Sequence, residues 1–186
     1  MMLTATDLHI ILPAATSGNI DRFCKPLNDA MDEFHINTPT RQAAFLAQIG
    51  HESGSLRYVR ELASGGAYEG RVDLGNTEPG DGVKFKGRGL IQITGKANYA
   101  ACGAALDEDL LGTPELLELP DLAARSAGWF WTTHGCNELA DAGNFQKLTR
   151  RINGGLNGLA ERMALWDRAK EHLIPRGRPS DSTAIA

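Results

Sequence analysis

Two glutamates nine positions apart, Glu52 and Glu61, are the side chains whose type and spacing best suit acid–base chemistry in this chain. Glu52 follows a nearly apolar stretch, residues 43–50, and precedes Ser53-Gly54-Ser55, where a helix would end. A carboxylate at the end of a buried helix is partly withdrawn from water, which is a common position for a catalytic acid. The pair therefore predicts a reaction in which one carboxyl group gives a proton and another takes one.

A Gly-rich segment follows Glu61 and contains the other candidates for the second role. Between Ser64 and Gly89 there are eight glycines and little apolar periodicity. Loops of this length in a compact domain are usually functional, so we expect the segment to contact a substrate. Four further carboxylates compete with Glu61: Glu69, Asp73, Glu78 and Asp81.

These features suit the hydrolysis of a glycoside, which needs a carboxylic acid for the leaving oxygen and a carboxylate that activates water. Other chemistries lack their signatures. A zinc peptidase beginning at His51-Glu52 would need a histidine where Ser55 stands. A phosphate-binding loop ending at Gly95-Lys96 would need a glycine in place of Leu90. No Ser or Cys nucleophile signature is present.

The helix that carries the first glutamate is predicted to begin at Thr38-Pro39 and to end at about Glu52. Threonine can cap the first free amides, and proline fits the first helical position. One stripe of this helix carries four side chains at helical spacing: Arg41, Phe45, Gln48 and Glu52. The stripe either faces water or lines a cleft.

The other elements are expected to be helical as well. Apolar spacing predicts helices over 4–15, 20–34, from 96, from 113, from 120, 145–152 and 159–173. Pro26 would interrupt or begin the second of these, and Thr113-Pro114 repeats the cap-and-proline start. Residues 87–95 are predicted to be extended, with Gln92 and Thr94 on one side. Trp129-Phe130-Trp131 is expected to lie in the core.

Composition excludes several classes of protein. The net charge of −4 and a pI of about 5.7 argue against a nucleic-acid partner. No apolar run is long enough to span a membrane, and the N-terminus lacks the basic residues of a signal peptide. The three cysteines are scattered, which indicates free thiols: Cys24, Cys102 and Cys136. We expect neither a metal nor a cofactor. We expect a monomer with one domain over 1–174 and a flexible tail over 175–186.

Four motifs in order resemble glycoside hydrolase family 19, a chitinase family that also contains phage endolysins. They cover roughly residues 38 to 173: Phe45-Leu-Ala-Gln-Ile-Gly-His51-Glu52-Ser-Gly, Arg60-Glu61, Gly87-Arg-Gly-Leu-Ile-Gln92-Ile-Thr94-Gly-Lys-Ala-Asn98-Tyr99, and Ile152-Asn153-Gly-Gly-Leu-Asn157-Gly with Arg162 after it.

The resemblance implies an all-α, lysozyme-like fold with two lobes around a central substrate cleft, and a long Gly-rich loop or small β-element. It also implies an inverting mechanism with Glu52 as general acid, Glu61 as general base and Thr94 holding the attacking water. Five further side chains would bind substrate: Gln92, Asn98, Tyr99, Asn153 and Arg162. Of these, Arg162 would be a charge that orients the carboxylates.

The differences from plant chitinases favour the endolysin branch. The segment between the two glutamates is short, and the cysteines suit a reduced compartment. The expected substrate is therefore the peptidoglycan glycan strand, and the protein would stay in the host cytoplasm until it is released to the cell wall. Chitin remains an alternative, since both polymers are β-1,4-linked amino sugars.

Two further readings stay open. Glu52-Ser53 with Gly89-Leu-Ile-Gln-Ile also resembles lytic transglycosylases, which would use Glu52 alone. A non-catalytic cell-wall binding or inhibitor protein is the remaining option, although it would have no need of paired carboxylates.

Overall fold

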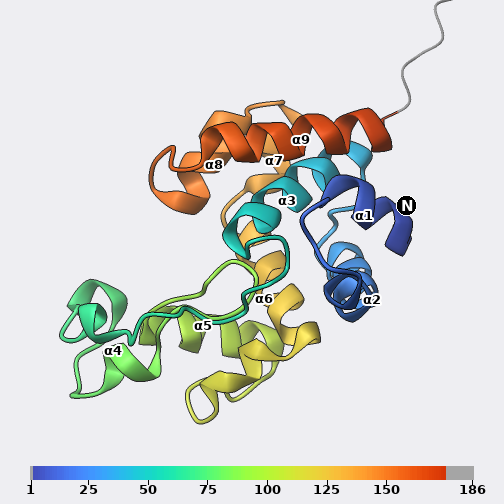
Figure 1. Cartoon of the computed structure of the whole chain (residues 1–186). Coiled ribbons are helices and arrows are strands. Elements are labelled where there is room, and N and C mark those ends of the chain that lie inside the picture. Colours follow the sequence, from blue (N-terminus) through green and yellow to red (C-terminus); the bar gives the residue numbers. More distant parts are fainter. Residues whose placement is uncertain (1, 175–186) are drawn as a thin grey trace, which may run out of the picture.

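The computed structural model describes residues 2–174, and helices dominate this part of the chain (Figure 1). In chain order the α-helices and the short 3-10 helices (η) are α1 (Ala5–Ile11), α2 (Ser17–Glu33), α3 (Pro39–Glu52), η1 (Gly66–Tyr68), η2 (Val72–Leu74), α4 (Asp81–Lys84), α5 (Lys96–Leu106), η3 (Pro114–Glu118), α6 (Pro120–Thr133), α7 (Cys136–Asp141), α8 (Phe145–Asn153) and α9 (Leu159–Leu173). Extended pairing in residues 2–174 is limited to two isolated β-bridges. The all-α prediction is confirmed.

Helix α3 forms the centre of the larger group of helices. The Thr38 hydroxyl accepts a hydrogen bond from the Arg41 N–H at 3.2 Å, and Pro39 is the first helical residue, so the helix begins where predicted. Residues 42–50 are all buried, and α3 packs against α7 and α9. Packing is tight at Gly50, where a Cβ would lie 2.6 Å from a methyl group of Leu12, after α1, and 3.2 Å from one of Leu165 in α9.

The polar stripe of α3 faces neither water nor an open cleft along its length. Arg41 pairs with Asp141 of α7, and Gln48, fully buried, donates to the Thr149 hydroxyl of α8 at 2.9 Å. Arg41 and Glu52, at the two ends of the stripe, are partly exposed, whereas Phe45 and Gln48 between them are buried. Side chains of α7 and α8 supply the hydrogen-bond partners of the polar groups on this stripe. Spacing in the sequence does not reveal such partners.

The helices lie in two groups (Figure 1). Helices α1, α2, α3, α7, α8 and α9 form one lobe, while α4, α5 and the segment around η1 and η2 form the other, with α6 contacting both α2 and α5. Residues 56–64 and 85–93 run side by side from the end of α3 into the smaller lobe. The predicted two-lobed arrangement is therefore present.

Several local expectations are wrong. Helix α2 continues through Pro26, because the buried proline and the residues around it pack into the core, which compensates for the missing backbone hydrogen bond. Residues 89–93 form a turn rather than an extended segment, with Gln92 at a φ of 58°. Thr113 makes no side-chain cap, and the element after it is the 3-10 helix η3.

Two smaller findings concern thiols and membranes. Cys24, Cys102 and Cys136 are free, as predicted, and burial raises the pKa of Cys102 and of Cys136 to about 12. No helix in the described part of the chain combines the length and apolarity needed to cross a membrane. The predicted tail over 175–186 lies outside the described residues.

The two ends of the described chain meet at Asp7. Its Oδ2 accepts hydrogen bonds from the Thr4 N–H and from the Thr4 hydroxyl, both at 2.7 Å. The bond from the Thr4 N–H, together with the bond from the Asp7 N–H to the Thr4 hydroxyl at 3.2 Å, forms the capping box of α1. The other carboxylate oxygen of Asp7 lies 2.7 Å from Nε2 of His172, near the end of α9. The hydrogen bond from Thr4 and then the contact with His172 lower the pKa of Asp7 below its ordinary value.

We predict that Asp7→Asn lowers the free energy of unfolding at pH 7 by about 1 kcal/mol, the usual contribution of a helix cap. Because the folded state binds the Asp7 proton less tightly than the unfolded chain, this contribution is complete above about pH 4 and is lost as the pH falls through the lower folded-state pKa. Urea unfolding of both proteins at pH 7 and at pH 3 measures the effect. An equal difference at the two pH values would contradict it.

Candidate functional site

The chain leaves Glu52 through a left-handed turn. Gly54, Ser55 and Leu56 have φ values of 57°, 59° and 66°. For a residue with a Cβ this conformation costs about 1–2 kcal/mol, so the surrounding structure must hold it. Glycine at position 54 was expected to end the helix, but the next two residues carry no sequence signal for this conformation.

Hydrogen bonds around Ser53 hold the turn in place. The Ser53 hydroxyl donates to the Ile49 carbonyl at 2.6 Å and accepts from the Leu56 N–H at 2.8 Å. The Ser55 N–H donates to the Gly50 carbonyl at 2.6 Å, and Leu56 is fully buried. The turn therefore fixes the direction in which the chain runs from Glu52 towards Glu61.

Glu52 is held by a buried arginine. Nη2 of Arg162, in α9, donates to Oε1 of Glu52 at 2.5 Å. The Arg162 side chain is 0% exposed and that of Glu52 is 17% exposed. The second carboxylate oxygen, Oε2, has no hydrogen-bond partner among residues 2–174. The ion pair thus fixes one oxygen of Glu52 and leaves the other available.

The other two guanidinium nitrogens of Arg162 also donate hydrogen bonds. Nη1 donates to Oε1 of Gln48 at 2.5 Å, and Nε donates to the Asn157 carbonyl at 3.2 Å. Gln48 in turn donates to the Thr149 hydroxyl, so Arg162 is linked through Gln48 to α8. Arg162 was predicted to bind substrate and to orient the carboxylates. Its side chain is fully buried, so it does not reach a substrate, and its bond to Glu52 agrees with the orienting role.

His51, beside Glu52, makes a second link to α9. Its Nδ1 lies 2.8 Å from Oε2 of Glu161. Its ring lies where a Cβ of Gly158 would be, and Gly158 has a φ of 69°, so this position requires glycine on both counts. The turn 154–158 is therefore fitted closely against the end of α3.

Glu61 is positioned by the Gly87-Arg-Gly89 sequence. The Glu61 N–H donates to the Gly87 carbonyl at 2.9 Å, and the Gly89 N–H donates to the Val59 carbonyl at 2.9 Å. A Cβ at position 87 would lie 2.9 Å from Oε1 of Gln92 and 3.3 Å from Oε2 of Glu61. Glycine at this position lets the carboxylate and the amide approach the same point of the backbone.

Both oxygens of the Glu61 carboxylate accept hydrogen bonds. The Tyr68 hydroxyl donates to Oε1 at 3.1 Å, and the Gly87 N–H donates to Oε2 at 3.2 Å. Three of the competing carboxylates have other partners: Glu69 accepts from the backbone N–H groups of Gly80 and Val83, Asp73 pairs with Arg71, and Asp81 pairs with Lys96. The Glu61 carboxylate instead lies near the Gln92 amide, since both side chains approach Gly87.

The polar side chains of the 92–98 region lie close together along the chain. Nε2 of Gln92 donates to the Gly89 carbonyl at 2.8 Å, and the Thr94 hydroxyl donates to the Gln92 carbonyl at 2.9 Å. Nδ2 of Asn98 donates to the Thr94 carbonyl at 2.8 Å. All three side chains keep exposed surface and unused acceptor or donor capacity.

Tyr99 does not share this exposure. Its side chain is fully buried, and its hydroxyl donates to the Lys86 carbonyl at 2.6 Å and accepts from Nη1 of Arg88 at 3.1 Å. Arg88 is itself buried and paired with Glu118. The prediction that Tyr99 contacts a substrate is contradicted, because α5 turns this side chain inward beneath the site.

Asn153 ends α8 and keeps an unsatisfied acceptor. Its Oδ1 is buried and has no hydrogen-bond partner among residues 2–174. Leaving a buried acceptor unpaired costs about 1–3 kcal/mol, and a bound donor would remove that cost.

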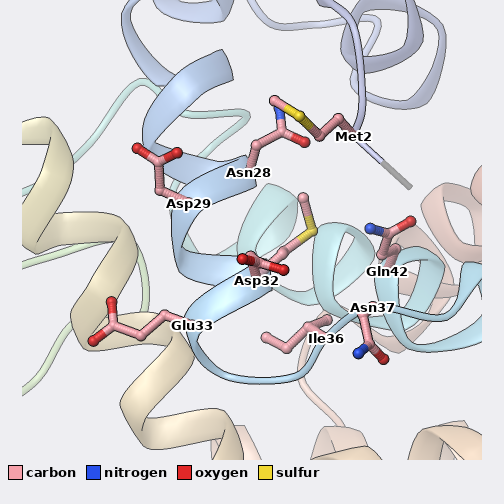
Figure 2. A pocket seen from close by; sticks show the side chains of 9 residues that line it. Met2, Asn28, Asp29, Asp32, Glu33, Ile36, Asn37 and Gln42 are labelled. Atoms are coloured by element: carbon pink, nitrogen blue, oxygen red, sulfur yellow. The ribbon is translucent and has the colours of Figure 1, made fainter.

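A separate pocket lies near the N-terminal end of α3, about 15 Å along the helix from Glu52 by the rise of an α-helix. Its volume is about 370 Å³, and Figure 2 shows Asp32 and Gln42 among the side chains around it. Glu33 at its edge pairs with Arg125 of α6. None of the predicted site residues lines this pocket, so it is not the site of the paired carboxylates.

Sequence reasoning identified Arg162 as a residue that orients a carboxylate but missed three other residues that support the two glutamates: Gln48, Tyr68 and Thr149. Gln48 carried a signal, since it is an amide within a nearly apolar helix, and Tyr68 is an aromatic hydroxyl within the Gly-rich segment. Thr149 carried none, because a threonine on a surface-patterned helix is ordinary. Tyr68 supports Glu61 directly, whereas Gln48 and Thr149 support Glu52 through Arg162.

Comparison with known proteins places these features in a family. The family model described as chitinase class I matches residues 33–142. A Haemophilus influenzae protein described as containing a glycosyl hydrolase family 19 domain is 34% identical over 197 residues, covering 89% of this chain and 94% of that protein. An Arabidopsis thaliana endochitinase is 38% identical, covering 70% of this chain but 45% of the plant protein.

Solved structures agree with the fold. A bacterial family 19 chitinase superposes with a TM-score of 0.76 at 26% identity, covering 95% of this chain and 97% of the other. Chitinase C from Streptomyces griseus has the same TM-score at 24% identity, over 96% of this chain and 79% of the other. The chain spans less than half of the Arabidopsis relative but nearly all of the Haemophilus one. This protein belongs to glycoside hydrolase family 19 and is a chitinase-like enzyme that cleaves glycosidic bonds.

Proposed function

We propose that this enzyme hydrolyses β-1,4 bonds of the peptidoglycan glycan strand by an inverting mechanism, with Glu52 as general acid and Glu61 as general base. The observation that carries the proposal is that each carboxylate is held separately, Glu52 by Arg162 and Glu61 by Tyr68 and the Gly87 N–H. Two fixed carboxylates with independent supports are what an acid–base pair requires.

Glu52 is suited to the acid role. Arg162 engages Oε1, which leaves Oε2 to carry the proton that passes to the glycosidic oxygen. The side chain is mostly buried at the end of a helix, so its orientation is fixed before substrate binds.

Glu61 is suited to the base role. In an inverting enzyme the carboxyl groups are about 6.5–9.5 Å apart, which leaves room for a water between the base and the sugar. The left-handed turn at 54–56 directs the chain away from α3, and the pairing of Glu61 with Gly87 fixes where it arrives. Thr94 would hold the attacking water, since its hydroxyl donates to the Gln92 carbonyl and keeps its acceptor capacity.

The glycan would be bound by amides. Gln92, Asn98 and Asn153 offer donors and acceptors that match sugar hydroxyl and N-acetyl groups without adding charge. The buried Oδ1 of Asn153 supports this, because a donor from the substrate would satisfy it.

Two features favour peptidoglycan as the polymer. Only eight residues separate Glu52 from Glu61, so this side of the site carries little chain that would crowd the lactyl and peptide substituents of muramic acid. The cysteines are free thiols, which suits a protein made in a reducing compartment and later released to the cell wall, as an endolysin would be.

Chitin is the second candidate, and the names of the relatives favour it. The Arabidopsis protein is described as an endochitinase and the structural neighbours as chitinases. The same acid–base pair would serve either polymer, because the bond that breaks is a β-1,4 bond of an amino sugar in both.

We predict that Glu52→Gln and Glu61→Gln each fold normally and each lose activity by about 10²–10⁴-fold, because the amide can neither give nor take the proton. Wild-type products should carry reducing ends and appear first as the α-anomer, which NMR of an early time point detects. Glu138→Gln, an exposed position on α7, is the matched control and should keep full activity.

The products also separate the mechanisms. Anhydro-muramic ends together with an active Glu61→Gln enzyme would show that Glu52 works alone, as in a lytic transglycosylase. Near wild-type activity of Glu52→Gln would remove Glu52 from the mechanism.

We predict faster turnover of purified peptidoglycan than of chitin oligomers of matched length. Release of reducing ends at equal enzyme concentration gives the comparison. Equal or faster turnover of chitin would assign the enzyme to chitin while leaving the roles of the two glutamates intact.

A further inference from the structure

The Gly-rich segment between Glu61 and α5 is built from internal hydrogen bonds. The Glu69 carboxylate accepts from the N–H groups of Gly80 and Val83, at 3.1 Å and 3.2 Å. A Cβ at Gly82 would overlap the Glu69 amide nitrogen and lie 2.7 Å from the carbonyl carbon of Tyr68. The segment therefore closes tightly on the backbone of residues 68–69.

Asn76 joins this backbone to the start of α5. It is fully buried, its Nδ2 donates to the Tyr68 carbonyl at 2.9 Å, and its Oδ1 accepts from the Lys96 N–H at 2.8 Å. A buried amide with both ends satisfied in this way holds two backbone positions in fixed relation. The position of Tyr68 is thus set by α5 and by residues 80–83.

Within residues 2–174, the hydroxyl of Tyr68 has one hydrogen-bond partner, which is Oε1 of Glu61 at 3.1 Å. Burial, and then the negative charge of Glu61, raise the pKa of Tyr68 above its ordinary value. The phenol therefore stays protonated and donates its hydrogen to the carboxylate across the neutral range.

We propose that Tyr68 is a positioning residue for the general base, and that the Gly-rich segment, through Asn76, serves to present it to Glu61. This rests on the proposed role of Glu61. The Tyr68 hydroxyl holds Oε1 while the Gly87 N–H holds Oε2, so rotation of the carboxylate is restricted and one lone pair on each oxygen stays available to accept a proton. A base held in this way meets the attacking water in a defined orientation.

The test is a double-mutant cycle of Tyr68→Phe and Glu61→Gln, with kcat and KM measured on soluble glycan fragments. Tyr68→Phe removes one oxygen and keeps the ring, so the fold is retained. We expect kcat to fall about tenfold, the effect of losing a hydrogen bond to a charged group, and KM to change less than about twofold. Tyr58→Phe, on the segment before Glu61, is the matched control and should behave as wild type.

The cycle separates positioning from other roles. If Tyr68 acts through Glu61, adding Tyr68→Phe to Glu61→Gln causes no further loss. The same tenfold loss in the Glu61→Gln background, an unchanged kcat for Tyr68→Phe, or a raised KM alone would each overturn the proposal. Full activity of the single variant Glu61→Gln would instead overturn the assignment of the base, and this result is read independently of the Tyr68 variants.

Discussion

The structure of the larger lobe depends on one fully buried cation. A guanidinium group withdrawn from water is costly unless its charge is paired and its N–H groups are satisfied. Each guanidinium nitrogen of Arg162 donates one hydrogen bond: to the Glu52 carboxylate, to the Gln48 amide oxygen and to the Asn157 backbone carbonyl. These partners come from α3 and from the turn before α9, so α3, α9 and that turn must be arranged together. The orientation of Glu52, the proposed acid, is therefore a condition of folding in this lobe.

The base is held by a different kind of support. Glu61 lies on an extended segment paired with residues 87–89, and its carboxylate is fixed by a backbone amide and a phenol. Glycine at position 87 is needed because a side chain there would occupy the space of the carboxylate and of Gln92. One carboxylate thus belongs to a rigid interface between helices and the other to a hydrogen-bonded segment of the second lobe. The proposed acid–base mechanism gains from this division, since each group is fixed before the substrate arrives.

Membership of the family says more about which reaction the enzyme catalyses than about which polymer it cleaves. Chitin and peptidoglycan share the β-1,4 bond and the amino sugar beside it, so the same residues around the two glutamates would suit either polymer. The difference between the polymers lies in the substituents of muramic acid, which would be accommodated or excluded at the edges of the site. The short connection between Glu52 and Glu61 is an edge of this kind, and its length is independent of the machinery that holds the carboxylates.

From the sequence alone, the helical class, the start and end of α3, the free thiols and the order of the four motifs could be predicted, because caps, apolar periodicity and motif spacing are local properties. The two glutamates and the amide and hydroxyl positions could be named for the same reason. The sequence could not show that Pro26 lies inside a continuous helix, that residues 89–93 turn, or that Tyr99 and Arg162 are buried, because packing between distant elements decides each of these. Gln48, Thr149 and Tyr68 became part of the site only through contacts spanning from seven to more than a hundred residues. Residue types and their spacing determined which chemistry was available, and tertiary packing decided which side chains hold the reacting groups, since a buried charge or carboxylate takes its partners from whatever elements the fold brings to it.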